Sequence, residues 1–204
     1  MTRDEALTLA ISWAERGVPA MPMQVSWDTR KSKTNKKPLT THGHKSATTD
    51  PAALHSMFRD ARVQAGDLAV GLWPGPAGYL VVDDDGGLDD NGEINNGSVE
   101  LVHTYHVVSA SGGLHLWFRK KDTTVQIGNE SPWDGIDIRA DNGGIMAPGS
   151  RVVLRTPPGE ATLEWWETLK FEGNVAMASP SLWDALTRSE ERRVGKECRS
   201  RWSP

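Results

Sequence analysis

The sequence has almost no cysteine and no long apolar run. Its 204 residues contain one cysteine, Cys198, which excludes an intramolecular disulfide and a zinc site built from two or more cysteines. No apolar segment approaches the roughly 18 residues that a membrane-spanning helix needs. Residues 1–16 carry three acidic side chains and lack a small-residue cleavage site, so they do not form a secretory signal. These absences predict a protein that neither spans a membrane nor carries a secretory signal.

The last seventeen residues differ from the rest. Residues 188–204 show no apolar periodicity, and their sequence resembles the in-frame translation of a synthetic sequencing adapter. By composition alone the segment is a basic, disordered tail. Leaving out its six basic and three acidic residues changes the formal net charge from −4 to −7. We therefore expect a domain at residues 1–170, a linker or the start of a next region at 171–187, and an artefactual disordered tail at 188–204.

Short-range patterns predict an α+β domain with two early helices and many later strands. Thr2 and Glu5 form a capping box ahead of an amphipathic helix, and Asp50 with Pro51 begins a second one. A short strand at 18–23 precedes a polar stretch at 24–49, which predicts a long loop. Further strands are expected at 68–72, 79–82, 104–108, 114–119, 136–138, 144–147, 152–154 and 162–166, with 136–138 and 144–147 paired around the turn at 141–143.

An apolar strand leads directly into three carboxylates, Asp83, Asp84 and Asp85. Because side chains alternate along a strand, Asp83 and Asp85 share one face and Asp84 lies on the other. Two carboxylates about 6–7 Å apart repel by roughly 2–3 kcal/mol at an effective dielectric near 20. A divalent cation between them removes that cost, and hard oxygen ligands favour Mg²⁺ or Mn²⁺. The alternative is a solvated strand end leading into an acidic turn.

Two later segments carry further candidate groups. The glycines of Ser111-Gly112-Gly113 let the backbone approach a ligand, and His115 begins the next strand, within reach of a phosphate or nucleotide. A hairpin turn followed by an exposed histidine explains the same residues. Asp137 lies between two isoleucines and faces away from them. It is either a third metal ligand or the partner of Arg139 on the same face.

Charge is distributed unevenly along the chain. Residues 29–49 contain six basic residues and no acid, whereas residues 83–93 contain six acids and no base. A basic loop facing an acidic metal centre suits a triphosphate or a nucleic-acid backbone. A solvated, mobile loop is the alternative. The basic residues are Arg30, Lys31, Lys33, Lys36, Lys37 and Lys45.

Taken together and in order, these segments resemble the bifunctional DNA primase/polymerase N-terminal (prim-pol) domain of the archaeo-eukaryotic primase superfamily. The resemblance extends over about residues 5–167. It rests on residues 10–20, 36–39, 44–51, 80–86, 109–118, 136–150 and 163–165. The resemblance implies a two-part α+β fold, in which an RNA-recognition-like sheet carries the acids and an N-terminal helical module closes the cleft.

The resemblance also implies roles for individual residues. Asp83, Asp85 and Asp137 match catalytic metal ligands for Mg²⁺ or Mn²⁺, and His115 matches a catalytic contact to the phosphates of the incoming nucleotide. Asp84 stands where the family usually has an apolar residue, so we expect a more exposed strand end. The polar linker at 89–98 puts the helix that usually follows in doubt. Nucleotide binding is further expected at Ser111, Gly112, Gly113, Arg139 and Lys45, and nucleic-acid binding at Lys36 and Lys37.

The implied activity is template-directed nucleotidyl transfer by a two-metal mechanism, as a DNA primase, a DNA polymerase or both. Its expected setting is phage, plasmid or mobile-element replication in the cytoplasm of a bacterial or phage-infected cell. The expected partners are a single-stranded DNA template, NTP or dNTP, and a fused or separate helicase. Two alternatives stay open. The same carboxylates suit a metal-dependent nuclease or phosphohydrolase, and the domain also suits a non-catalytic nucleic-acid-binding module of a larger replication protein.

Overall fold

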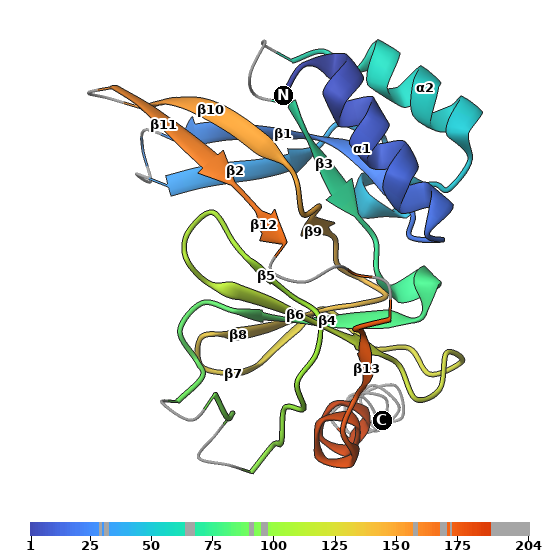
Figure 1. Cartoon of the computed structure of the whole chain (residues 1–204), viewed down its shortest axis with the longest axis vertical. Coiled ribbons are helices and arrows are strands. Elements are labelled where there is room, and N and C mark those ends of the chain that lie inside the picture. Colours follow the sequence, from blue (N-terminus) through green and yellow to red (C-terminus); the bar gives the residue numbers. More distant parts are fainter. Residues whose placement is uncertain are drawn as a thin grey trace, which may run out of the picture.

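A computed structural model shows two β-sheets in separate layers, with helices on the outer sides (Figure 1). It describes residues 1–28, 30, 33–63, 68–89, 92–94, 98–156, 159–167, 171 and 173–188. The predicted mixed α+β class is confirmed. The tail expected beyond Arg188 lies outside the described residues. No helix in the described part of the chain is long and apolar enough to cross a membrane.

The smaller sheet has four antiparallel strands with one face covered by α1 and α2 (Figure 1). Its order is β2 (Lys33–Pro38), β1 (Ala20–Asp28), β3 (Leu68–Leu72) and β9 (Ile145–Met146). Helix α1 (Arg3–Glu15) begins at the predicted capping box of Thr2 and Glu5, and α2 (Pro51–Asp60) begins at the Asp50 cap. Both helices bury their apolar side chains against the sheet, which confirms the two amphipathic patterns.

The larger sheet holds the strand with the three carboxylates near its centre. Its order is β12 (Trp166–Glu167), β5 (His106–Val108), β6 (Leu114–Arg119), β4 (Tyr79–Asp84), β8 (Ile136–Arg139) and β7 (Glu130–Trp133), and β13 (Ala176–Met177) pairs with β6 in parallel. A separate hairpin joins β10 (Arg151–Thr156) to β11 (Gly159–Glu164). Two 3₁₀ turns complete the elements, η1 (Gly43–Ser46) and η2 (Gly75–Ala77).

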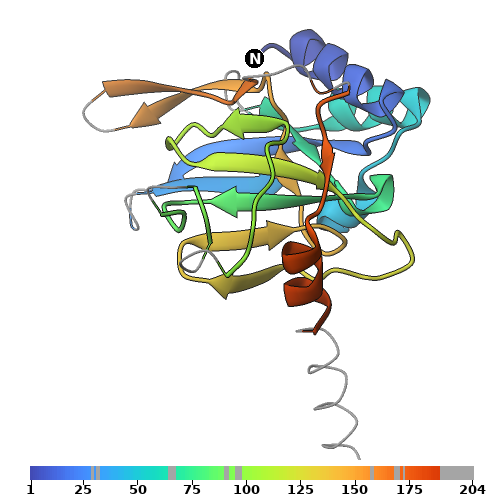
Figure 2. The same cartoon turned by 60° about the horizontal axis from the view of Figure 1, so that its bottom comes forward.

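The two faces of the larger sheet bury different cores. One face packs toward the smaller sheet, where Trp117 of β6 stacks on Trp13 of α1 with ring centroids 5.7 Å apart. The other face is covered by a helix at residues 180–188, drawn in red on the side away from α1 and α2 (Figure 2). Leu182 and Leu186 of this helix are fully buried. Within the segment expected as a linker or the start of a next region, 171–187, several apolar side chains are buried: Phe171, Val175, Ala178, Leu182 and Leu186.

Two expectations about the strands are wrong. The loop expected at 24–49 instead contains the rest of β1, all of β2 and η1. Strand β2 lacks apolar alternation because it is an edge strand, and polar side chains at an edge face solvent. Residues 136–138 and 144–147 do not pair with each other. Strand β8 pairs with β4 in the larger sheet and β9 pairs with β3 in the smaller one. The turn between β8 and β9 therefore carries the chain from one sheet to the other.

Asp84 makes the end of β4 more buried than expected. Its side chain is on the face away from the smaller sheet and 7% of the residue is exposed. Oδ1 accepts hydrogen bonds from the backbone N–H groups of Gly86, Gly87 and Leu88, at 3.0, 2.7 and 3.2 Å. The expectation of an exposed strand end is therefore wrong, because this carboxylate folds back and caps the following turn.

We expect Asp84→Ala to lower the free energy of unfolding by about 2–3 kcal/mol, because backbone N–H groups lose a charged acceptor. Urea unfolding followed by tryptophan fluorescence measures this change. Asp60→Ala is the control, since the Asp60 side chain is 67% exposed and pairs only with neighbouring Arg59 in the salt bridge that the structure shows. If the urea midpoint of Asp84→Ala equals that of Asp60→Ala, Asp84 does not stabilise the turn that follows β4.

Candidate active site

Three candidate side chains lie in one row across the larger sheet. In the strand register, Asp83 of β4 is opposite His115 of β6 on one side and opposite Asp137 of β8 on the other. Directly opposite residues place their side chains on the same face. This is the face toward the smaller sheet, because Val81 and Trp117, two residues further along β4 and β6, are buried in the shared core. Antiparallel pairing thus joins three motifs that are far apart in the sequence.

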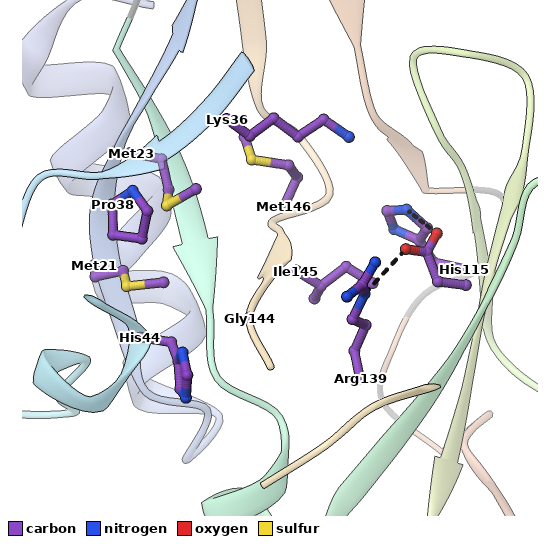
Figure 3. Close-up of a pocket in the computed structure, with 11 residues that line it drawn as sticks. Met21, Met23, Lys36, Pro38, His44, His115, Arg139, Gly144, Ile145 and Met146 are labelled. Carbon is purple, nitrogen blue, oxygen red and sulfur yellow. Dashed lines mark hydrogen bonds and ion pairs between the residues drawn. The ribbon is translucent and has the colours of Figure 1, made fainter. Parts of the chain in front are cut away.

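Arg139 bridges the two carboxylates of the row. Its Nε lies 3.3 Å from Asp83 Oδ2, and its Nη2 lies 2.5 Å from Asp137 Oδ2. On the other side of Asp83, Oδ1 lies 3.3 Å from His115 Nε2. Dashed lines in Figure 3 mark the two bonds that lead from His115 and Arg139 to the carboxylate of Asp83. The pairing of Asp137 with Arg139, one of the two interpretations of this motif, is therefore present.

The environment of Asp83 favours its ionised form. Burial by itself would raise the pKa of this carboxyl group. The hydrogen bond from His115, with the charges of His115 and Arg139, outweighs burial and holds the pKa of Asp83 below its ordinary value. Asp83 is consequently a carboxylate at neutral pH, the form that a divalent cation binds.

Asp83, His115 and Arg139 form one wall of the main cavity, which has a volume of about 270 Å³ and lies between the two sheets. The opposite wall is apolar and comes from the smaller sheet, mainly from Met21, Met23 and Met146 (Figure 3). Lys36 of β2 also lines the cavity. A charged wall facing an apolar one suits a ligand that has an anionic part and a less polar part.

Comparison with protein families identifies the family of the chain. A family model described as bifunctional DNA primase/polymerase, N-terminal, matches residues 10–180, which include the whole row and both walls of the cavity. The chain belongs to this Prim-Pol family. No individual curated protein matches the chain.

Asp85 is the last of the three consecutive aspartates in this Prim-Pol domain. It lies just beyond the end of β4 and is exposed. It lines a second hollow together with Asp137 and a third one together with Ser111. Among the described residues, no group of three or more His, Cys, Asp or Glu side chains is close enough to hold a metal ion. Asp83 and Asp137 are opposite each other on the interior strands β4 and β8, with Arg139 bound to both, and Asp85 lies just beyond the end of β4.

The Ser111-Gly112-Gly113 turn is built mainly for packing. A Cβ at Gly113 would lie 2.3 Å from the carbonyl oxygen of Asp84, so glycine lets β6 approach β4. The N–H of Gly112 donates to the carbonyl of Ser109 within the turn, at 3.0 Å. Of the three predicted nucleotide-binding residues in this turn, Ser111 alone lines a cavity in the part of the chain that the structure describes.

Of the three lysines predicted to bind nucleotide or nucleic acid, one lines the main cavity and two do not. Lys36 lines the main cavity, and its Nζ lies 5.4 Å from the centre of the Trp165 ring. Lys37 is on the opposite face of β2 because side chains alternate, and Lys45 on η1 is exposed. Neither lines a cavity found among the described residues.

His44, and not the neighbouring Lys45 that we expected near the nucleotide, lines the main cavity. Its ring meets Trp73 edge-on, with ring centroids 5.3 Å apart. Its buried Nε2 has no hydrogen-bond partner among the described residues. Burial, with a smaller contribution from the charge of Lys45, lowers the pKa of His44 below 6.5. The 3₁₀ turn η1 has only four residues, too few for a side-chain pattern to repeat, so the sequence carries no signal for which of the two side chains turns inward.

We expect the stability of the domain to fall as the pH decreases through and below about 6.5, because the unfolded state protonates His44 there and the folded state resists it. In His44→Gln the urea midpoint should change less between pH 7.5 and 5.5 than in the wild type. His55→Gln, at an exposed position of α2, is the matched control. Identical pH profiles for His44→Gln and the wild type would contradict this assignment.

Proposed function

We propose that this Prim-Pol domain is a template-directed nucleotidyltransferase that makes primers, DNA chains or both, in phage, plasmid or mobile-element replication. Membership of the family supports DNA primase/polymerase chemistry. The observation that carries the proposal is the row of Asp83, His115 and Asp137, aligned in register. Asp83 and His115 line the main cavity with Arg139 and Lys36, and Asp137 lines a neighbouring hollow with Asp85. Ionised acids beside fixed cationic groups suit a reaction on a polyanionic triphosphate.

The donor set fits Mg²⁺ or Mn²⁺, because it consists of carboxylate oxygens that include an ionised Asp83. Asp83, Asp85 and Asp137 would hold the metal once their side chains move together, because in this structure they are not close enough to form a metal site. When bound, such a metal lowers the pKa of the attacking 3′-hydroxyl and offsets the charge of the triphosphate. Loading requires Arg139 to release the two carboxylates, and its side chain is 25% exposed and so accessible from the cleft.

The remaining residues of the cleft would bind and orient the nucleotide. A guanidinium released from Asp83 and Asp137 can form paired hydrogen bonds with phosphate oxygens, which have a geometry similar to that of a carboxylate. Lys36 adds a second positive charge from the opposite sheet. His115, held by Asp83 at 3.3 Å, fixes the orientation of that carboxylate. The proposed partners are a single-stranded DNA template and NTP or dNTP.

Primer extension tests the proposal. A labelled primer on a longer template, and the template alone, are incubated with the full chain, Mg²⁺ or Mn²⁺, and either dNTPs or NTPs. We expect products that need metal, template and triphosphates together. Degradation of labelled DNA without triphosphates would show a nuclease instead. DNA binding with no incorporation under any of these conditions would show a non-catalytic module, and either result would overturn the proposal.

A further inference from the structure

The hollow that Ser111 and Asp85 line adjoins the main cavity. Its volume is about 510 Å³, and it lies between the edge of the smaller sheet, the turn before β6 and the chain that follows β11. Lys36 lines both hollows, so the two are neighbours across this one side chain. We call it the Trp27 groove, after the tryptophan of β1 that lines it.

The Trp27 groove combines an aromatic ring, a cation and hydroxyl groups. Trp27 lies directly opposite Thr34 in the pairing of β1 with β2, and Lys36 is two residues further along β2, so all three share a face. Lys36 also lies against the Trp165 ring, and the hydroxyl-bearing Ser111 lines the groove across from β2. Proteins bind single-stranded nucleic acid with this combination, in which rings stack on bases and cations meet phosphates.

We propose that the Trp27 groove stacks a base of a single-stranded nucleic acid beside the main cavity. This inference rests on the proposed function, in which a template strand must reach the site of nucleotide addition. The charges of the lining determine where the phosphates of the bound strand lie. Asp85 repels phosphates from one part of the lining, whereas Lys36 attracts them toward the boundary with the main cavity. A base within a duplex has both faces already stacked, so the groove selects a single strand.

Equilibrium binding of short labelled oligonucleotides to the full chain tests the groove without catalysis. Fluorescence anisotropy is measured with oligo(dT) and with oligo(rU), in the absence of triphosphate and divalent metal. We expect Trp27→Ala to weaken binding by about 5–150-fold, the loss of one stacked base, and Trp27→Phe to retain most of the affinity. Trp183→Ala is the matched control, because Trp183 is half-buried and packs on the far core. Tighter binding of one oligonucleotide identifies DNA or RNA as the preferred strand.

The outcomes separate this inference from the proposed function. Equal affinities of Trp27→Ala and the wild type, or a wild type that binds neither oligonucleotide, would overturn the groove even if primers are extended. Binding that depends on Trp27, in a chain that extends no primer, would support the groove and overturn polymerase activity. Circular dichroism of each variant checks the fold. If the alanine variant unfolds, Trp27→Leu replaces it, because leucine keeps an apolar side chain without a ring and should lose the same affinity.

Discussion

Asp83→Asn is expected to reduce nucleotide incorporation by about 10³-fold or more. A bound metal contributes several kcal/mol of transition-state stabilisation, and every 1.36 kcal/mol corresponds to a factor of ten in rate. Asp83 is the central residue of the row and contacts both His115 and Arg139. Asparagine has the same shape but no charge, so it cannot hold a divalent cation or the guanidinium in the same way. Primer extension under single-turnover conditions measures the loss.

The fold should survive this substitution. An asparagine oxygen still accepts the hydrogen bond from His115, so we expect only a small shift in the thermal midpoint. Asp60→Asn, at a largely exposed carboxylate on α2, should extend primers like the wild type. Incorporation by a folded Asp83→Asn variant within a few-fold of this control would remove Asp83 from the catalytic machinery, whatever the family pattern implies.

Lys120→Met is expected to lower the free energy of unfolding by about 3–5 kcal/mol, the largest stability effect that we predict. Lys120 Nζ lies 2.8 Å from Asp141 Oδ2, and the two side chains are 0% and 8% exposed. The same oxygen accepts a hydrogen bond from the Ile127 N–H, at 2.7 Å. Removing the ammonium leaves a buried carboxylate without its cation, which costs far more than a surface charge would.

A second substitution separates charge from packing. Lys120→Met combined with Asp141→Asn removes both charges and keeps an acceptor for Ile127, so the double variant should be more stable than Lys120→Met alone. Urea unfolding of both variants measures this difference. If the double variant is as unstable as the single one, the loss comes from packing and not from the unpaired charge.

This ion pair also stabilises the geometry of the cleft. Asp141 follows β8 of the larger sheet, where the chain turns toward β9 of the smaller one, and its carbonyl accepts a hydrogen bond from Trp73 Nε1 at 2.9 Å. A Cβ on Gly75 would lie 2.5 Å from the Asp141 Cα, so η2 packs directly on this turn. The pair thus stabilises the segment that crosses between the two walls of the main cavity.

Much of the fold follows from signals that span only a few residues. The cap at Thr2 and Glu5 and the cap at Asp50 mark both helices, because cap and helix lie within one turn of each other. Alternation likewise places Asp83 and Asp137 on the inner faces of their strands. Strand β2 was missed because an edge strand needs no apolar side chains, and the pairing of 136–138 with 144–147 was wrong because adjacency in sequence does not decide which sheet a strand joins.

The sequence by itself determined which strand carries the carboxylates, which side chains share a face, and, through the order and spacing of its motifs, the Prim-Pol family. The tertiary structure alone decided the pairing of Arg139 with two acids, the burial of Asp84, the entry of His44 instead of Lys45 into the cleft, and the groove at Trp27. The reason is physical. Side-chain alternation and capping are local, whereas cavities and ion pairs depend on the register between strands that are distant along the chain.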